Sequence, residues 1–172
     1  MKTRRITFLG LMVGYSLILY ILETYIPNPL IVFFPGAKLG LTNIVTLIAL
    51  LIFGLKETFF IVTVRVILSS MFTGPLSYLL FSIGGAYLSL ILMYLVSKIK
   101  GLSIIGVSIV GAIGHNIGQL LVASLIVENL LMITYLPFML LTSLATGFFV
   151  GLVSKFCYPK MKKMGDYFIE IK

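Results

Sequence analysis

Six long apolar runs limit what this chain can fold into more than any other feature. About 20 apolar residues in a helix rising 1.5 Å each cover the roughly 30 Å hydrocarbon core of a bilayer. The runs are continuous rather than alternating, which excludes a transmembrane β-barrel. We therefore predict an all-α integral membrane bundle, a single transmembrane domain over residues 1–172. Its six transmembrane helices are expected at about residues 6–26, 39–53, 58–72, 75–97, 102–127 and 130–154.

The distribution of charge supports this class of protein. Only 10% of the residues are charged, against about 25% in soluble domains. With six spans and both termini inside, eleven of the basic residues fall on the cytoplasmic side, which is the pattern of the positive-inside rule: Lys2, Arg4, Arg5, Lys56, Lys98, Lys100, Lys155, Lys160, Lys162, Lys163 and Lys172. The net charge of +8 therefore indicates topology and attraction to anionic lipid, and we expect no nucleic-acid partner.

Proline and glycine suggest where the helices end. Pro27, Gly54, Gly101 and Pro159 are expected at helix boundaries. Pro137 falls inside the last run, where it should kink the helix. The longest connection, residues 27–38, is apolar and bounded by prolines, so we expect it to form a structured cap on the outer side.

A polar cluster interrupts the run over residues 102–127. His115 and Gln119 are four residues apart and share a helix face, whereas Asn116 is turned from His115 by about 100°. Gly111, Gly114 and Gly118 form a smooth stripe that lets another backbone approach. Polar groups facing hydrocarbon cost several kcal/mol, so these side chains should point into the bundle. There they either line a pocket or join helices through hydrogen bonds.

Arg65 lies at the middle of the run over residues 58–72. It cannot lose its proton and costs at least about 2.5 kcal/mol at the bilayer centre, so it needs a partner. Its planar fork suits a carboxylate or a phosphate. The alternative is a structural tie to helix carbonyls or to the amides of Asn116 and Gln119.

Further polar residues lie toward the outer side. Lys38 opens the helix expected from residue 39, where it opposes the macrodipole, so we expect an anion nearby or a salt bridge to Glu23. Asn43 lies one turn inside, with Thr42 and Thr46 beside it. Such polar groups indicate a cavity open to the outside, although Ser and Thr also bond their own helix carbonyls.

Catalytic motifs are missing. The sequence has no phosphate-binding G-x-x-x-x-G-K-[ST] motif, and its five acidic residues are too dispersed for an aspartate-rich magnesium site. His115 lacks the neighbours of a metal site or catalytic triad, and the single Cys157 cannot form an internal disulfide. We therefore expect no catalytic residue, no metal and no cofactor.

Two segments, PGAKLGLTNIVTL (35–47) and GHNIGQL (114–120), resemble a bacterial membrane family known as the Gx transporter family or heptaprenyl diphosphate synthase component I. The architecture also resembles the S components of energy-coupling factor (ECF) transporters. That resemblance implies the bacterial cytoplasmic membrane and a six-helix bundle whose first outer loop covers a small-molecule site. It also implies a small-residue motif on the first helix that docks a transmembrane coupling subunit, which connects to ATPases. Gly10 and Gly14 occupy that place, where S components usually carry alanines; an internal packing face is the alternative.

The leading hypothesis is a substrate-binding transport subunit that takes a small anionic or amphipathic solute from outside and relies on partners for energy. The residues expected to contact the solute are Lys38, Asn43, Arg65, His115, Asn116 and Gln119. The alternative is a non-catalytic accessory subunit for isoprenoid, quinone or electron-transfer machinery, with the polar cluster joining helices. A membrane enzyme acting on a diphosphate and a proton-coupled carrier that uses His115 are further alternatives.

Overall fold

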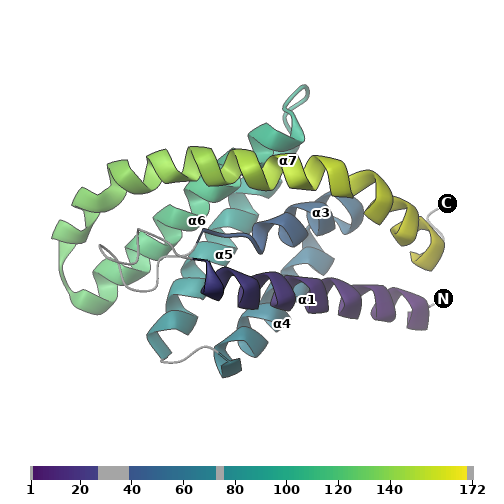
Figure 1. Ribbon diagram of the computed structural model, residues 1–172, viewed down its shortest axis with the longest axis horizontal. Coiled ribbons are helices and arrows are strands. Elements are labelled where there is room, and N and C mark those ends of the chain that lie inside the picture. Colours follow the sequence, from purple (N-terminus) through teal and green to yellow (C-terminus); the bar gives the residue numbers. More distant parts are fainter. Residues whose placement is uncertain (1, 27–38, 73–75, 170–172) are drawn as a thin grey trace.

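The computed structural model describes residues 2–26, 39–72 and 76–169, and within them it contains helices and no strand. The predicted all-α class is therefore confirmed. The helices are α1 (Lys2–Tyr25), α3 (Asn43–Phe53), α4 (Leu55–Phe72), α5 (Leu76–Ser97), α6 (Ile104–Val127) and α7 (Leu136–Ile169), with a short 3-10 helix, η1 (Leu130–Tyr135), before α7 (Figure 1). Lys38 and the expected cap over residues 27–38 lie outside the described residues.

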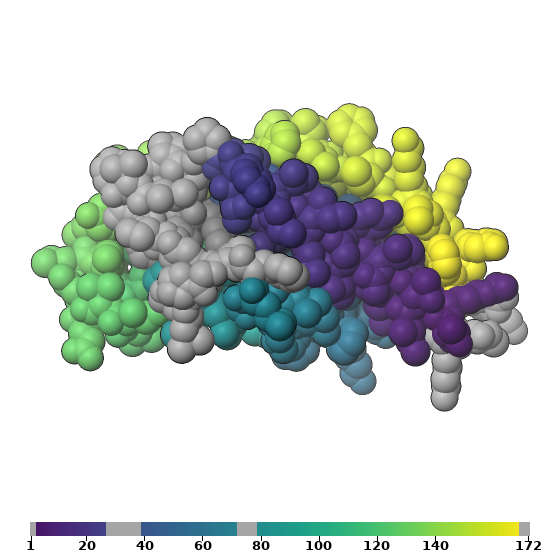
Figure 2. All heavy atoms as spheres, turned by 60° about the horizontal axis from the view of Figure 1, so that its bottom comes forward, coloured from purple at the N-terminus to yellow at the C-terminus, as the bar shows by residue number. Residues whose placement is uncertain are grey.

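The helices pack around α3, which lies at the centre of the bundle. Its residues from Asn43 to Leu50 are all buried. One side of α3, with Ile44 and Ile48, joins a core cluster with α1, α4 and α7, and the other, with Leu47 and Leu50, joins a cluster with α4, α5 and α6. Figure 2 shows α1 crossing one face of the molecule, between α4 and the C-terminal part of α7. The two termini lie at the same end (Figure 1).

Four segments of the described chain are long and apolar enough to cross a membrane: Thr3–Tyr25, Leu79–Ser97, Ile104–Val127 and Leu130–Phe168. α3 has 11 residues and so covers only about half of the roughly 30 Å core. α4 carries Lys56, Glu57 and Arg65 within its 18 residues. A multi-pass membrane protein fits these helices, while the six-span count and the cytoplasmic location of the termini stay predictions.

The two prolines of the last helix occupy positions in it that differ from the predicted ones. Pro137 lies in the first turn of α7, where its missing N–H is not needed and no kink is required. Pro159, expected at the end of this helix, lies inside it, and α7 continues to Ile169. Tertiary packing accounts for the extension, because the rings of Phe168 and Phe8 stack with their centroids 5.5 Å apart.

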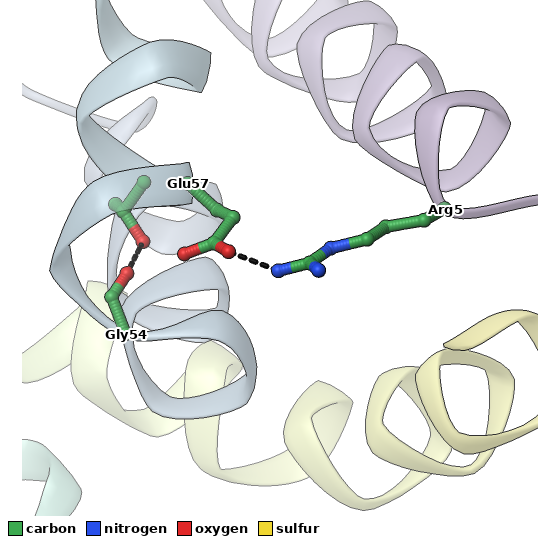
Figure 3. Close-up of polar contacts among 4 residues, drawn as sticks. Arg5, Gly54 and Glu57 are labelled. Atoms are coloured by element: carbon green, nitrogen blue, oxygen red, sulfur yellow. Dashed lines mark hydrogen bonds and ion pairs between the residues drawn. The ribbon is translucent and has the colours of Figure 1, made fainter. Parts of the chain in front are cut away.

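All six helix starts differ from the expected positions by one to six residues; α3, for example, begins at Asn43 rather than at residue 39. The starts of α4 and α6 each have a local reason. α4 begins at Leu55 rather than at residue 58, directly after Gly54, whose φ of 82° is a backbone conformation that favours glycine. The hydroxyl of Thr58 then donates to the Gly54 carbonyl over 2.7 Å (Figure 3). α6 begins at Ile104 rather than at residue 102, because the Ser103 hydroxyl accepts the N–H of Gly106 and caps the helix.

Close packing of α5 on α6 positions the polar cluster. A Cβ atom on Gly118 would lie 2.2 Å from the carbonyl oxygen of Gly84, and one on Gly111 would lie 2.5 Å from the side chain of Met93. The predicted glycine stripe therefore does let a neighbouring backbone approach, and that neighbour is α5. As a result, the polar side chains of α6 lie within reach of the bundle centre.

Candidate functional site

A small polar cavity lies among α1, α4, α5, α6 and the segment that precedes α3. Its volume is about 10 Å³, which is roughly the space of one water molecule. The structure thus brings the predicted residues Arg65 and His115 together at one space. The cavity is lined by Tyr20, Glu23, Gly40, Thr42, Arg65, Ser82 and His115.

Arg65 is the cationic residue of this cavity and is only 2% exposed. Its Nη1 donates to the hydroxyl of Thr42 over 2.7 Å, rather than to the amides of Asn116 or Gln119. Nε and Nη2 have no hydrogen-bond partner within the described part of the chain. Two donors of the guanidinium fork are therefore available to an acceptor such as a carboxylate or a phosphate.

Glu23 supplies the opposite charge. It is buried, lines the same cavity and interacts electrostatically with Arg65. Its carboxylate also accepts the backbone N–H groups of Gly40 over 2.6 Å and of Leu41 over 3.1 Å. Negative charge ahead of α3 is favourable for the helix dipole. Glu23 therefore joins the segment before α3 to the C-terminal end of α1, while its predicted partner Lys38 lies outside the described residues.

His115 and Gln119 come from α6 and face α5 at Gly85. A Cβ atom on Gly85 would lie 3.0 Å from Nδ1 of His115 and 2.9 Å from Cγ of Gln119. The glycine thus provides the space that these two side chains fill. Gln119 is completely buried, and neither its Oε1 nor its Nε2 has a hydrogen-bond partner among the residues described. A buried polar group left unpaired costs about 1–3 kcal/mol of folding free energy, so this amide destabilises the fold.

Asn43 lies at the start of α3 beside the same segment. It is buried, and its Oδ1 lacks a hydrogen-bond partner in the described ranges. Its Nδ2 lies close to Gly40, where an added Cβ would come within 3.1 Å of it and within 3.6 Å of the His115 ring. Asn43 therefore lies beside Gly40, which lines the cavity, without being a lining residue itself. Its predicted contact with a solute stays a prediction.

Asn116 faces a different neighbour. Its Nδ2 donates to the Met139 carbonyl over 2.9 Å and to the Ser143 hydroxyl over 2.8 Å, both on α7. These bonds join α6 to α7, and Asn116 is not among the residues that line the cavity. Two roles were predicted for the polar cluster, lining a pocket or joining helices through hydrogen bonds. The side-chain N–H groups of Asn116 join helices.

Sequence reasoning missed Tyr20, Ser82 and Gly85. Tyr20 and Glu23 lie three residues apart on one face of α1, and that spacing is a signal that could have found Tyr20. Nothing local distinguishes Ser82 from other serines in apolar helices, and Gly85 matters only because of what α6 places against it.

The charges of the cavity suit recognition of a ligand rather than metal binding. A guanidinium and a carboxylate of opposite sign face one space with an imidazole, which is an arrangement able to orient an anionic or a zwitterionic group. In the ranges that the structure describes, no three His, Cys, Asp or Glu side chains lie together as a metal site would require.

Gly10 and Gly14 lie on α1. A Cβ atom added to either one would meet none of the described atoms within 4 Å. The alternative of an internal packing face is therefore wrong for these two residues as far as the structure describes their surroundings. The predicted docking of a partner subunit stays a prediction.

The comparison with known protein families covers most of the chain. Residues 12–157 match the family described as heptaprenyl diphosphate synthase component I. The chain has no significant match among curated proteins or among solved structures. The matched range includes Arg65, the polar cluster of α6 and every residue that lines the cavity. The chain therefore belongs to the heptaprenyl diphosphate synthase component I family.

Proposed function

We propose that this protein is a membrane-embedded binding subunit for a small anionic or amphipathic solute, resembling the S components of ECF transporters. In this proposal the chain crosses the bacterial cytoplasmic membrane six times, with both termini in the cytoplasm. The solute enters from the extracellular side, and partner subunits, an ECF coupling subunit with its ATPases, supply the energy. The observation that carries the proposal is the buried guanidinium of Arg65, which lines the cavity and has two donors without a hydrogen-bond partner among the described residues.

The chemistry of Arg65 supports an anionic group on the solute. A buried arginine must be paired to be tolerated, and Glu23 provides only part of the solution because its oxygens also accept two backbone N–H groups. A carboxylate or phosphate placed against Nε and Nη2 would accept two parallel hydrogen bonds. Gln119, beside His115, and Asn43 hold further polar atoms that have no hydrogen-bond partner in the described part of the chain.

The position of the cavity supports entry from outside. Glu23 lies near the C-terminal end of α1, far along the helix from the N-terminus. Since the two termini lie at the other end of the molecule (Figure 1), the cavity belongs to the extracellular half when the termini are cytoplasmic. A cavity of about one water corresponds to a closed state, so binding requires the surrounding helices to separate.

Native mass spectrometry of the purified protein tests this function. We expect a small molecule to be retained by the wild type and lost from Arg65→Lys, because lysine cannot reproduce the two-donor fork. Arg4→Lys, at an exposed arginine of α1 that does not line the cavity, is the matched control and should retain the molecule. No retained molecule in the wild type, or equal retention in Arg65→Lys, would count against the proposal. Solute accumulation by the chain alone in liposomes would contradict the dependence on partners.

A second candidate function is a non-catalytic accessory subunit of an isoprenoid or quinone pathway, or of electron-transfer machinery. The family name, a component of a prenyl diphosphate synthase, favours it, as do the water-sized cavity and the bonds of Asn116 to α7. In this case the polar residues only hold helices together. Arg65→Lys would then lower stability without changing the retention of any small molecule, and a prenyl diphosphate synthase subunit would co-purify with the chain.

A further inference from the structure

An apolar groove runs between α1 and α4 at the end of the molecule that holds the N-terminus. Its volume is about 740 Å³, within the range of about 300–1,000 Å³ typical of small-molecule sites. Ile6, Leu9 and Val13 line it from α1, and Phe60 and Val64 line it from α4. The groove is separate from the polar cavity and shares no lining residue with it.

The depth of the groove matches one leaflet of a bilayer. Its lining extends along α1 from Arg5 to Val13 and along α4 from Lys56 to Val64, which is about 12 Å in each helix at 1.5 Å per residue. Half of the hydrocarbon core is about 15 Å. A transmembrane helix of a partner would cross both leaflets, whereas a lipid chain occupies only one.

Charged residues stand at one end of this groove. Arg5 forms an ion pair with Glu57 across the mouth (Figure 3). Lys56 is exposed and forms no ion pair with any described residue. Two cations and one carboxylate leave the mouth with one net positive charge. Basic pockets between transmembrane helices on the cytoplasmic side bind anionic lipid head groups.

We propose that this groove binds an anionic phospholipid of the cytoplasmic leaflet. One acyl chain lies between α1 and α4 against Gly10, and the phosphate contacts Lys56 and the outward side of Arg5. Gly10 fits this role because a Cβ atom there would meet no described atom within 4 Å, so the space beside it is free for a chain. The inference goes beyond the proposed solute-binding function and does not depend on it.

Lipid retention by the delipidated, full-length protein in detergent tests the inference. The probes are phosphatidylglycerol and phosphatidylcholine with identical acyl chains, and native mass spectrometry counts the bound molecules. We expect one phosphatidylglycerol, retained more strongly than phosphatidylcholine. Gly10→Leu should lose both lipids, because the leucine side chain fills the groove.

Charge variants separate the head-group contact from the chain contact. Lys56→Gln should weaken phosphatidylglycerol binding about fivefold, and Glu57→Gln should strengthen it, because it removes the carboxylate and frees Arg5. Lys100→Gln changes a lysine that does not line the groove and should leave binding unchanged.

Three results would overturn the inference: equal retention of the two lipids, undiminished lipid binding in Gly10→Leu, or a co-purifying protein subunit that Gly10→Leu displaces while lipid binding persists. Should Gly10→Leu fail to fold, the comparison of Lys56→Gln with Glu57→Gln still decides, because both residues lie at the groove mouth rather than in the core. Unchanged phosphatidylglycerol binding in both of these variants would also contradict it.

Discussion

Arg65 is a buried charged residue, so it needs a counter-charge and hydrogen-bond partners. Its charge is balanced by Glu23, and one of its donors is used by Thr42. Glu23 comes from α1 and Arg65 from α4, so their pairing also joins these two helices. Removing one partner of a buried charge pair leaves the other uncompensated, which typically costs about 3–5 kcal/mol.

A double-mutant cycle at this pair should therefore show strong coupling. Arg65→Leu alone is expected to destabilise the protein by about 3–5 kcal/mol, because it breaks the buried charge pair of Arg65 with Glu23. Adding Glu23→Gln should recover part of that loss, since the remaining amide is neutral. Thermal unfolding of the detergent-solubilised variants measures the coupling. Additive effects of the two substitutions would show that the charges do not depend on each other.

Substitutions of Asn116 and of Gln119 should have opposite effects on the stability of the protein. Asn116→Ala removes two hydrogen bonds to α7 and leaves the Met139 carbonyl short of one donor, so we expect a loss of about 1–3 kcal/mol. Gln119→Leu replaces an unpaired buried amide with an apolar group of similar size and should be neutral or stabilising. The midpoints of thermal unfolding compare the two. Equal losses would mean that the amide of Gln119 is satisfied in the membrane.

The sequence allowed the burial of Arg65 and His115 to be predicted, because neither side chain tolerates hydrocarbon. It also placed Asn116 on a different helix face from His115. It could not show which neighbour each face meets. That information depends on the tertiary arrangement, in which α5 faces His115 and α7 faces Asn116.

At the scale of the helices, glycine spacing sets how closely α5, α6 and α7 pack. Gly118 on α6 contacts the backbone of Gly84, and Gly147 on α7 stands where a Cβ atom would come within 2.7 Å of Cα of Ile109 on α6. Backbone atoms cannot move aside as flexible side chains can. These glycines therefore set the distances of α5 and α7 from α6. The position of the polar side chains of α6 relative to their neighbours depends on these distances.

Gly118→Ala should be strongly destabilising, because its Cβ would lie 2.2 Å from the Gly84 carbonyl oxygen. Overpacking of this kind typically costs about 1–3 kcal/mol or more. Gly14→Ala is the matched control, since a Cβ atom there meets nothing described within 4 Å and alanine favours a helix by about 1 kcal/mol. Thermal unfolding should show a large loss for the first and a small gain for the second. Similar midpoints would contradict the close α5–α6 contact.

The existence of the helices could be predicted from hydrophobicity, but several of their ends could not. The start of α6 depends on a cap by Ser103, a residue type that marks helix starts in sequence, whereas the hydrophobic run used for the prediction begins at Leu102. The continuation of α7 through Pro159 depends on the packing of Phe168 against Phe8. Contacts between residues so far apart in the chain leave no local signal.

At the scale of the whole molecule, the positive-inside rule predicts that the end with most of the basic residues lies in the cytoplasm. Cys157 offers a direct check of that orientation, because it is the chain's only cysteine and is exposed. We expect a membrane-impermeant thiol reagent to modify it in inverted vesicles and to leave it unmodified in intact cells. Modification in intact cells would place the basic end outside and reverse the topology.

In the proposed function, the cavity at Arg65 opens to the extracellular side. Ser82 lines that cavity from α5 and is buried, so a cysteine in its place reports access to it. The measurement is the labelling of Ser82→Cys, in a Cys157→Ser background, by a small membrane-impermeant thiol reagent applied to intact cells. We expect the cysteine to be modified from outside under native conditions, as the helices around the cavity separate. Protection of this cysteine until the protein is denatured would show that the polar residues are sealed within the bundle, and a cavity that opens to the outside would then be wrong.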